Sequence, residues 1–239
     1  MNSNSDKFLE TYKLIEEEIK SKYGNKLKSP AEAIVYAENN LLQQGDRAFL
    51  DYCRKLRNFV VHETVATPSG IDVEPNKAIV DYLDEIYHNK ILKPLTAQRL
   101  SIKFNEVFTA SEKDNVLQII REMKKHCYTH VPIMSEGHII GVFSENTIMD
   151  YVGTEPLVDF SEKIIADMGE CLKLDKHITE VFYFLGKDTL YNELKQKFED
   201  EYSSGKRIGM IFVTAHGKQT EKPLGIITAW DVLGNKDVE

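Results

Sequence analysis

Two short strings in the C-terminal part of the chain combine a glycine with a hydroxyl residue at the same spacing. They are Gly141-Val-Phe-Ser144 and Gly225-Ile-Ile-Thr228. Each hydroxyl residue can cap a following helix, and the free N–H groups at a helix N-terminus attract phosphate. Asp231 follows Thr228 by three residues, and its carboxylate could accept hydrogen bonds from the vicinal hydroxyls of a ribose. Thr228 and Asp231 therefore indicate a nucleotide clamp, although the same spacing is typical of an ordinary helix N-cap.

The first string differs from the second at the position of the carboxylate. Thr147 stands where Asp231 stands in the second copy, and threonine cannot act as a charged double acceptor. Ser144 is thus a candidate ligand residue in a less complete site. Lys206 and Arg207, just before the strand IGMIFV, could pair with phosphates, or they could be a solvated charge cluster.

Arg57, Asn58 and His62 form a separate candidate site at the end of a predicted helix. Arginine grips phosphate through a planar fork, and histidine exchanges a proton near neutrality. Such a pair could cleave RNA without a metal, with the histidine as base for the 2′-OH and the arginine as stabiliser of the phosphate charge. Positions five apart diverge by about 140° on a regular helix, so Arg57 and His62 do not share a face. As a bare string, this spacing is more typical of an exposed helix end than of a catalytic site.

Apolar periodicity predicts the elements that carry these residues. Spacings of three and four residues indicate four helices before residue 95, at about 5–24, 29–41, 46–62 and 75–92. Four helices with short connections favour a small bundle. Beyond residue 95, short β-rich runs alternate with amphipathic helices, which is typical of α/β units.

The second part of the chain contains an internal repeat. Its first copy has a helix at 111–127, strands at 130–134 and 139–143, and a helix at 144–152. The second copy has a strand at 178–185, a helix at 187–202, strands at 207–214 and 223–228, and a helix at 229–234. The copies differ mainly in the length of the hairpin between their last two strands.

This repeated unit, which ends in Gly-x-x-Ser/Thr before a helix, resembles the CBS family over roughly residues 100–236. The resemblance implies two repeats packed about a pseudo-twofold axis, with clefts that hold AMP, ADP, ATP or S-adenosylmethionine. Gly225, Thr228 and Asp231 match the family's ribose-phosphate motif completely, and the first copy departs from it at Thr147. The family's adenine pocket implies an apolar lining, for which the candidates are Val181, Phe182, Tyr183, Met210 and Phe212.

The helical part, with LRNFVVHE at the end of its third helix, is similar to the HEPN superfamily. Arg57, Asn58 and His62 match the motif of that superfamily residue by residue. Many of its members are metal-independent RNases that work as dimers, and others have the fold without catalysis. The resemblance therefore implies a helical fold, a homodimer and, as one alternative, RNA as a substrate.

These patterns predict an α+β protein with three parts: a HEPN-like four-helix bundle at 1–95 and β-α-β-β-α CBS repeats at 96–155 and 156–239. No apolar run approaches the ~20 residues of a membrane span, and no secretory signal precedes the first helix, so we expect a cytoplasmic protein without a membrane partner. Three scattered cysteines suggest neither a disulfide framework nor a metal site. The net charge of −8 weighs against a constitutive nucleic-acid binder.

Two functional hypotheses follow. The first is a regulatory protein in which an adenine nucleotide, bound by the CBS pair, changes the packing or dimer geometry of the helical part. The alternative is a nucleotide-regulated, metal-independent RNase that uses Arg57 and His62.

Overall fold

The computed structural model describes residues 3–62, 74–154 and 159–234. The chain divides into two compact units, the first made chiefly of residues up to Leu95 and the second chiefly of residues from Thr96 onward. The first unit is helical, and the second combines helices with two sheets.

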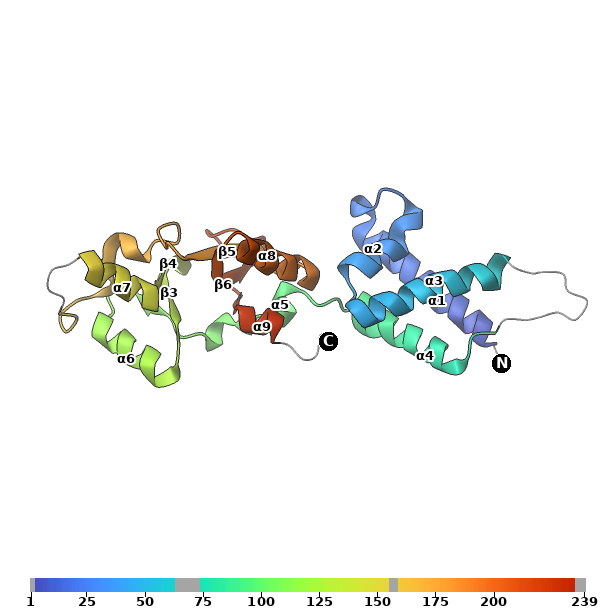
Figure 1. Cartoon of the computed structure of the whole chain (residues 1–239), viewed down its shortest axis with the longest axis horizontal. Helices are drawn as coiled ribbons and strands as arrows, with labels where there is room; N and C mark the ends of the chain where they lie inside the picture. The colour runs from blue at the N-terminus through green and yellow to red at the C-terminus, as the bar shows by residue number, and fades with distance from the viewer. Residues whose placement is uncertain (1–2, 63–73, 155–158, 235–239) are drawn as a thin grey trace, which may run out of the picture. The chain divides into compact units, whose positions relative to one another are not determined.

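The helical unit contains the four α-helices that the periodicity predicted (Figure 1). They are α1 (Asn4–Tyr23), α2 (Ala33–Asn40), α3 (Gln44–His62) and α4 (Lys77–Ile86), with the short turns η1 (Gly24–Lys26) and η2 (Pro30–Glu32) between α1 and α2, and the π-turn η3 (Tyr87–Ile91) after α4. Helix α1 packs on α2 and α4, and α3 packs on α2 and α4.

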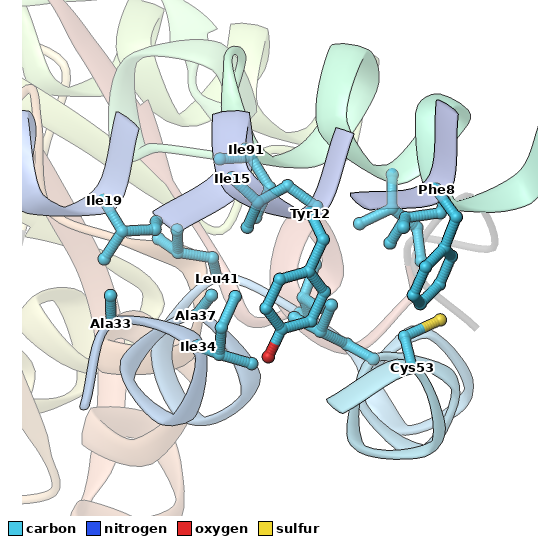
Figure 2. Packing of buried hydrophobic residues seen from close by; sticks show 14 of the residues in the cluster. Phe8, Tyr12, Ile15, Ile19, Ala33, Ile34, Ala37, Leu41, Cys53 and Ile91 are labelled. Atoms are coloured by element: carbon cyan, nitrogen blue, oxygen red, sulfur yellow. The ribbon is translucent and has the colours of Figure 1, made fainter. Parts of the chain in front are cut away.

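The core of this unit is built on one face of α1. Phe8, Ile15 and Ile19 are fully buried at helical spacing, because that face meets the neighbouring helices. In Figure 2 Ile15 and Ile19 lie opposite the apolar side chains of α2, and the thiol of Cys53 in α3 points toward the ring of Phe8. Burial raises the pKa of Cys53 to about 12, so its sulfur stays a protonated, unreactive thiol.

The first repeat folds around a three-stranded sheet with the order β2-β3-β4. Its elements are β2 (Ala110–Ser111), α6 (Val116–His126), β3 (His130–Ser135), β4 (His138–Ser144) and α7 (Glu145–Thr154). Helix α6 connects the parallel pair β2 and β3, as parallel strands require. The antiparallel pair β3 and β4 closes through Glu136 and Gly137, which both have positive φ, the geometry of a tight hairpin.

The second repeat has the same connectivity of helices and strands as the first. Its elements are β5 (Glu180–Gly186), α8 (Tyr191–Ser203), β6 (Arg207–Thr214), β7 (Gly225–Ile227) and α9 (Ala229–Leu233). Strands β5 and β6 are parallel and β6 and β7 antiparallel, in the order β1-β7-β6-β5. The added edge strand, β1 (Ile102–Lys103), precedes the first repeat in sequence but pairs with the sheet of the second.

The glycine of each motif stands where another segment crosses closely. A Cβ at Gly225 would lie 2.6 Å from the carbonyl oxygen of Ile102, in the strand that pairs with β7. A Cβ at Gly141 would lie 2.5 Å from the carbonyl oxygen of Leu172, the last residue of η5 (Ile165–Leu172). Two short helices, α5 (Ala97–Leu100) and η4 (Phe104–Glu106), flank β1. The sequence did not predict these crossing segments.

Candidate functional site

A cleft of about 420 Å³ opens between the two repeats. We call it the main cleft; it is lined by residues 106–108, 127–130, 207–210 and 228–230, together with Ile102, Glu145, Glu180 and Ile226. This volume lies within the range of ordinary small-molecule sites. Aromatic surface is available at its rim, because Trp230 is 84% exposed and Tyr128 stacks against Phe108 at a ring separation of 5.9 Å.

Thr228 and Asp231 form a reciprocal helix cap. The N–H and the hydroxyl of Thr228 both donate to Oδ2 of Asp231, at 2.7 and 2.8 Å. Thr228 lines the main cleft, whereas Asp231 is half-buried and does not line it. Both donors converge on Oδ2, and Oδ1 takes part in neither of these two hydrogen bonds. Helix α9 has only five residues, and its dipole therefore adds little to anion binding.

The other candidates of the second repeat separate into two places. Arg207 and Met210 line the main cleft with Thr228. Val181 and Tyr183 line a second depression of about 230 Å³, which we call the side cleft. Tyr183 is already engaged there, since its hydroxyl donates to Glu201 and the ammonium of Lys197 lies 3.5 Å from its ring centre. The hydrogen bond to Glu201 is the main reason that the pKa of Tyr183 rises to about 12.

Ser144 has a different environment from Thr228. Its side chain is 1% exposed, and it lines neither the main cleft nor the side cleft. Its N–H donates to Oγ1 of Thr147 at 3.0 Å, and the N–H of Thr147 donates to Oγ of Ser144 at 3.3 Å. Thr147 thus completes the same cap that Asp231 completes in the second repeat, but without a charge. Nearby, η5 packs on β4 and α7.

A buried carboxylate, which the sequence reasoning missed, separates the main cleft from the side cleft. Glu180 at the start of β5 is 2% exposed and lines both. Its Oε1 accepts from Nδ2 of Asn146 at 2.5 Å and from the guanidinium of Arg207, and its Oε2 lies 3.1 Å from Nε2 of His130. Burial would raise the pKa of Glu180, but His130 and Arg207 lower it to about 2. Glu180 is therefore ionised at neutral pH.

The candidate residues of the helical unit, Arg57, Asn58 and His62, all lie on α3 but not on one face of it. Helix α3 continues through His62, so a backbone rotation of about 140° separates that position from Arg57. Asn58 is exposed and Arg57 half-buried, and the side chain of His62 lies outside the described residues. Arg54, one turn earlier, pairs with Asp51 and with the buried Glu38. The RNase hypothesis and the homodimer stay predictions.

Within the described ranges, no helix has the length and apolar character that a bilayer span requires. No cluster of histidine, cysteine and acidic side chains in these ranges has the arrangement of a metal site.

One family model matches part of the chain. Residues 101–154 match the family model described as "CBS domain". The match confirms the CBS resemblance for the first repeat, and the HEPN resemblance of the helical unit is not confirmed. No curated protein matches the chain.

Several solved structures resemble part of the chain. The CBS domain of a bacterial CNNM/CorC family Mg²⁺ transporter in complex with ATP is 16% identical, with 58% of this chain and 84% of that chain covered and a TM-score of 0.40. CbpB in complex with c-di-AMP is 16% identical, with 59% and 83% covered and a TM-score of 0.44. A putative archaeal homolog of g-AMPK from Methanocaldococcus jannaschii is 15% identical, with 58% and 46% covered and a TM-score of 0.44.

Proposed function

We propose that the main cleft binds an adenosine-based ligand and that its occupancy regulates the helical unit. The observation that carries this proposal is the cleft itself. It combines the Thr228 hydroxyl, the Arg207 guanidinium and the exposed Trp230 ring within about 420 Å³. A hydroxyl and a cation suit a sugar phosphate, and an exposed indole suits a base. The match of residues 101–154 to the CBS family supports the same proposal.

The sole tryptophan of the chain gives a local readout of this cleft. Because Trp230 lines it, a stacked ligand should change the fluorescence excited at the indole band. The panel is adenosine, AMP, ADP, ATP and S-adenosylmethionine, followed in parallel by thermal unfolding. A ligand at ~100 times its dissociation constant should add about 2.7 kcal/mol to the free energy of unfolding. Flat fluorescence and unchanged melting across the panel would contradict the proposal.

Thr228→Val is expected to weaken the best ligand about tenfold, because it removes the polar group of a residue that lines the cleft, together with the hydrogen bond that this hydroxyl donates to Asp231. Thr228→Ser keeps the hydroxyl and should restore most of the affinity. Ser203→Ala removes a hydroxyl from the exposed C-terminal residue of α8; it is the control and should bind as the wild type does. The dissociation constants come from the Trp230 titration. Unchanged affinity in Thr228→Val would remove Thr228 from the site.

Regulation requires that the ligand favour one state of the helical unit over another. We therefore expect saturating ligand to change the amide hydrogen exchange of α1–α4, measured by mass spectrometry of the full chain. Protection confined to the second unit would leave a ligand-binding module without coupling.

A further inference from the structure

Glu180 places a permanent negative charge beside the one cationic side chain of the main cleft. Arg207 is the only lysine or arginine among the described residues that line this cleft, and its guanidinium donates to Oε1 of Glu180. The Arg207 side chain is 65% exposed, so it can also face a ligand, while Glu180 is held inside. Any anion that approaches Arg207 therefore meets the carboxylate of Glu180 directly behind it.

The position of Glu180 is fixed by groups from both repeats. Asn146 of α7 and His130 of β3 belong to the first repeat, and Arg207 of β6 belongs to the second. A buried carboxylate is tolerated only when such partners surround it. Its low pKa means that protonation does not remove the charge at neutral pH.

The side chains that line the main cleft carry more negative than positive charge, even apart from the pair of Glu180 and Arg207. Glu106 and Glu145 also line it, so three carboxylates stand against Arg207 and the imidazole of His130. Glu106 and Glu145 are both exposed and therefore screened by solvent, whereas Glu180 is buried and screened much less. Repulsion of a ligand anion thus comes mainly from Glu180.

We propose that Glu180 sets the charge class of the ligand: the main cleft accepts an adenosine derivative with at most one phosphate and discriminates against di- and triphosphates. This rests on the proposed function. S-adenosylmethionine, which carries no phosphate, falls in the accepted class. Each further phosphate adds negative charge that Arg207 does not neutralise, because its guanidinium is already paired with Glu180.

The test compares adenosine, AMP and ATP on the wild type and on Glu180→Gln by Trp230 fluorescence at constant ionic strength. The glutamine keeps the shape and one acceptor oxygen and removes the charge. We expect the wild type to bind adenosine and AMP more tightly than ATP. In Glu180→Gln, ATP should bind about tenfold more tightly or better, AMP should gain less, and adenosine should stay within about twofold. Glu106→Gln, on the exposed wall, should change ATP affinity less than about threefold.

A second measurement needs no variant. If the negative charge of the cleft repels polyphosphate, added salt screens this repulsion and should strengthen ATP binding to the wild type. If the cleft attracts polyphosphate, added salt should weaken ATP binding. Equal effects of Glu180→Gln on adenosine and ATP, or ATP binding that weakens with salt, would overturn the inference while the cleft remains a ligand site. If no ligand of the panel alters fluorescence or melting in any variant, the proposed function falls, and this inference falls with it.

Discussion

Gly225→Ala is expected to lower the free energy of unfolding by about 2–3 kcal/mol, because the new methyl group has no space. It would lie 2.5 Å from Oγ of Ser101 and 2.6 Å from the carbonyl oxygen of Ile102. The serine side chain can rotate away, but the carbonyl belongs to β1, which pairs with β7 at this position. The substitution therefore forces β1 away from the sheet of the second repeat. Urea unfolding, followed by circular dichroism, measures the change.

Gly153→Ala is the matched control for this substitution. Gly153 lies in α7, and no atom of another segment lies within 4 Å of the position that a Cβ would take there. Alanine at this position should therefore be neutral or slightly stabilising through its helix propensity. If Gly225→Ala and Gly153→Ala unfold at the same urea concentration, the close crossing of β1 over β7 is not a constraint in solution. A selective loss in Gly225→Ala would also show that the motif glycine serves packing as well as any ligand.

The order of helices and strands could be predicted because the local spacing of apolar residues differs between the two kinds of element. Phe8, Ile15 and Ile19 recur at helical spacing, and they are buried on one face of α1. The repeat could be recognised because Gly141 and Gly225 stand at the same place in two similar strings. Gly141 lies in β4 and Gly225 is the first residue of β7. Each of these strands leads into the final helix of its repeat.

The crossing segments could not be predicted in the same way. Strand β1 has two residues, both exposed, and too few positions to show a period of two. Its partner β7 lies more than a hundred residues later, and no local pattern encodes such a pairing. The pairing of residues 102–103 with the sheet of the second repeat is therefore visible only in the structure.

The candidate site was predictable only where a motif marks it. The spacing of Thr228 and Asp231 predicted their contact, but not that Asp231 would accept from Thr228 without lining the cleft. Glu180 draws its partners from three other elements, and no spacing in the sequence brings these together. The one available signal was a carboxylate within the apolar strand ITEVFYFL, where an acidic residue is costly unless it is paired.

The stability of the second unit is expected to fall between pH 7 and pH 5 because of His177. Its side chain is 1% exposed, and neither ring nitrogen has a hydrogen-bond partner among the described residues. Burial lowers the pKa of His177, and the nearby charges of Glu180 and Asp150 offset this only in part. Below the unfolded value of about 6.5, the unfolded chain binds a proton that the folded chain does not. The free energy of unfolding should therefore drop with decreasing pH, by up to about 1.4 kcal/mol per unit.

His177→Leu should remove most of this slope, because leucine cannot be protonated and suits the contact with Phe182, whose ring centre lies 4.8 Å from that of His177. His88→Gln, a substitution at an exposed ring, should keep the slope of the wild type. The measurement is urea unfolding at pH 7, 6 and 5. Glu180 does not interfere in this range. Its pKa is about 2 in the folded protein and about 4.5 in the unfolded chain, so its stabilising contribution is lost only as the pH falls below about 4.5. Parallel slopes in His177→Leu and the wild type would show that His177 accepts its proton in the folded protein as readily as in the unfolded chain.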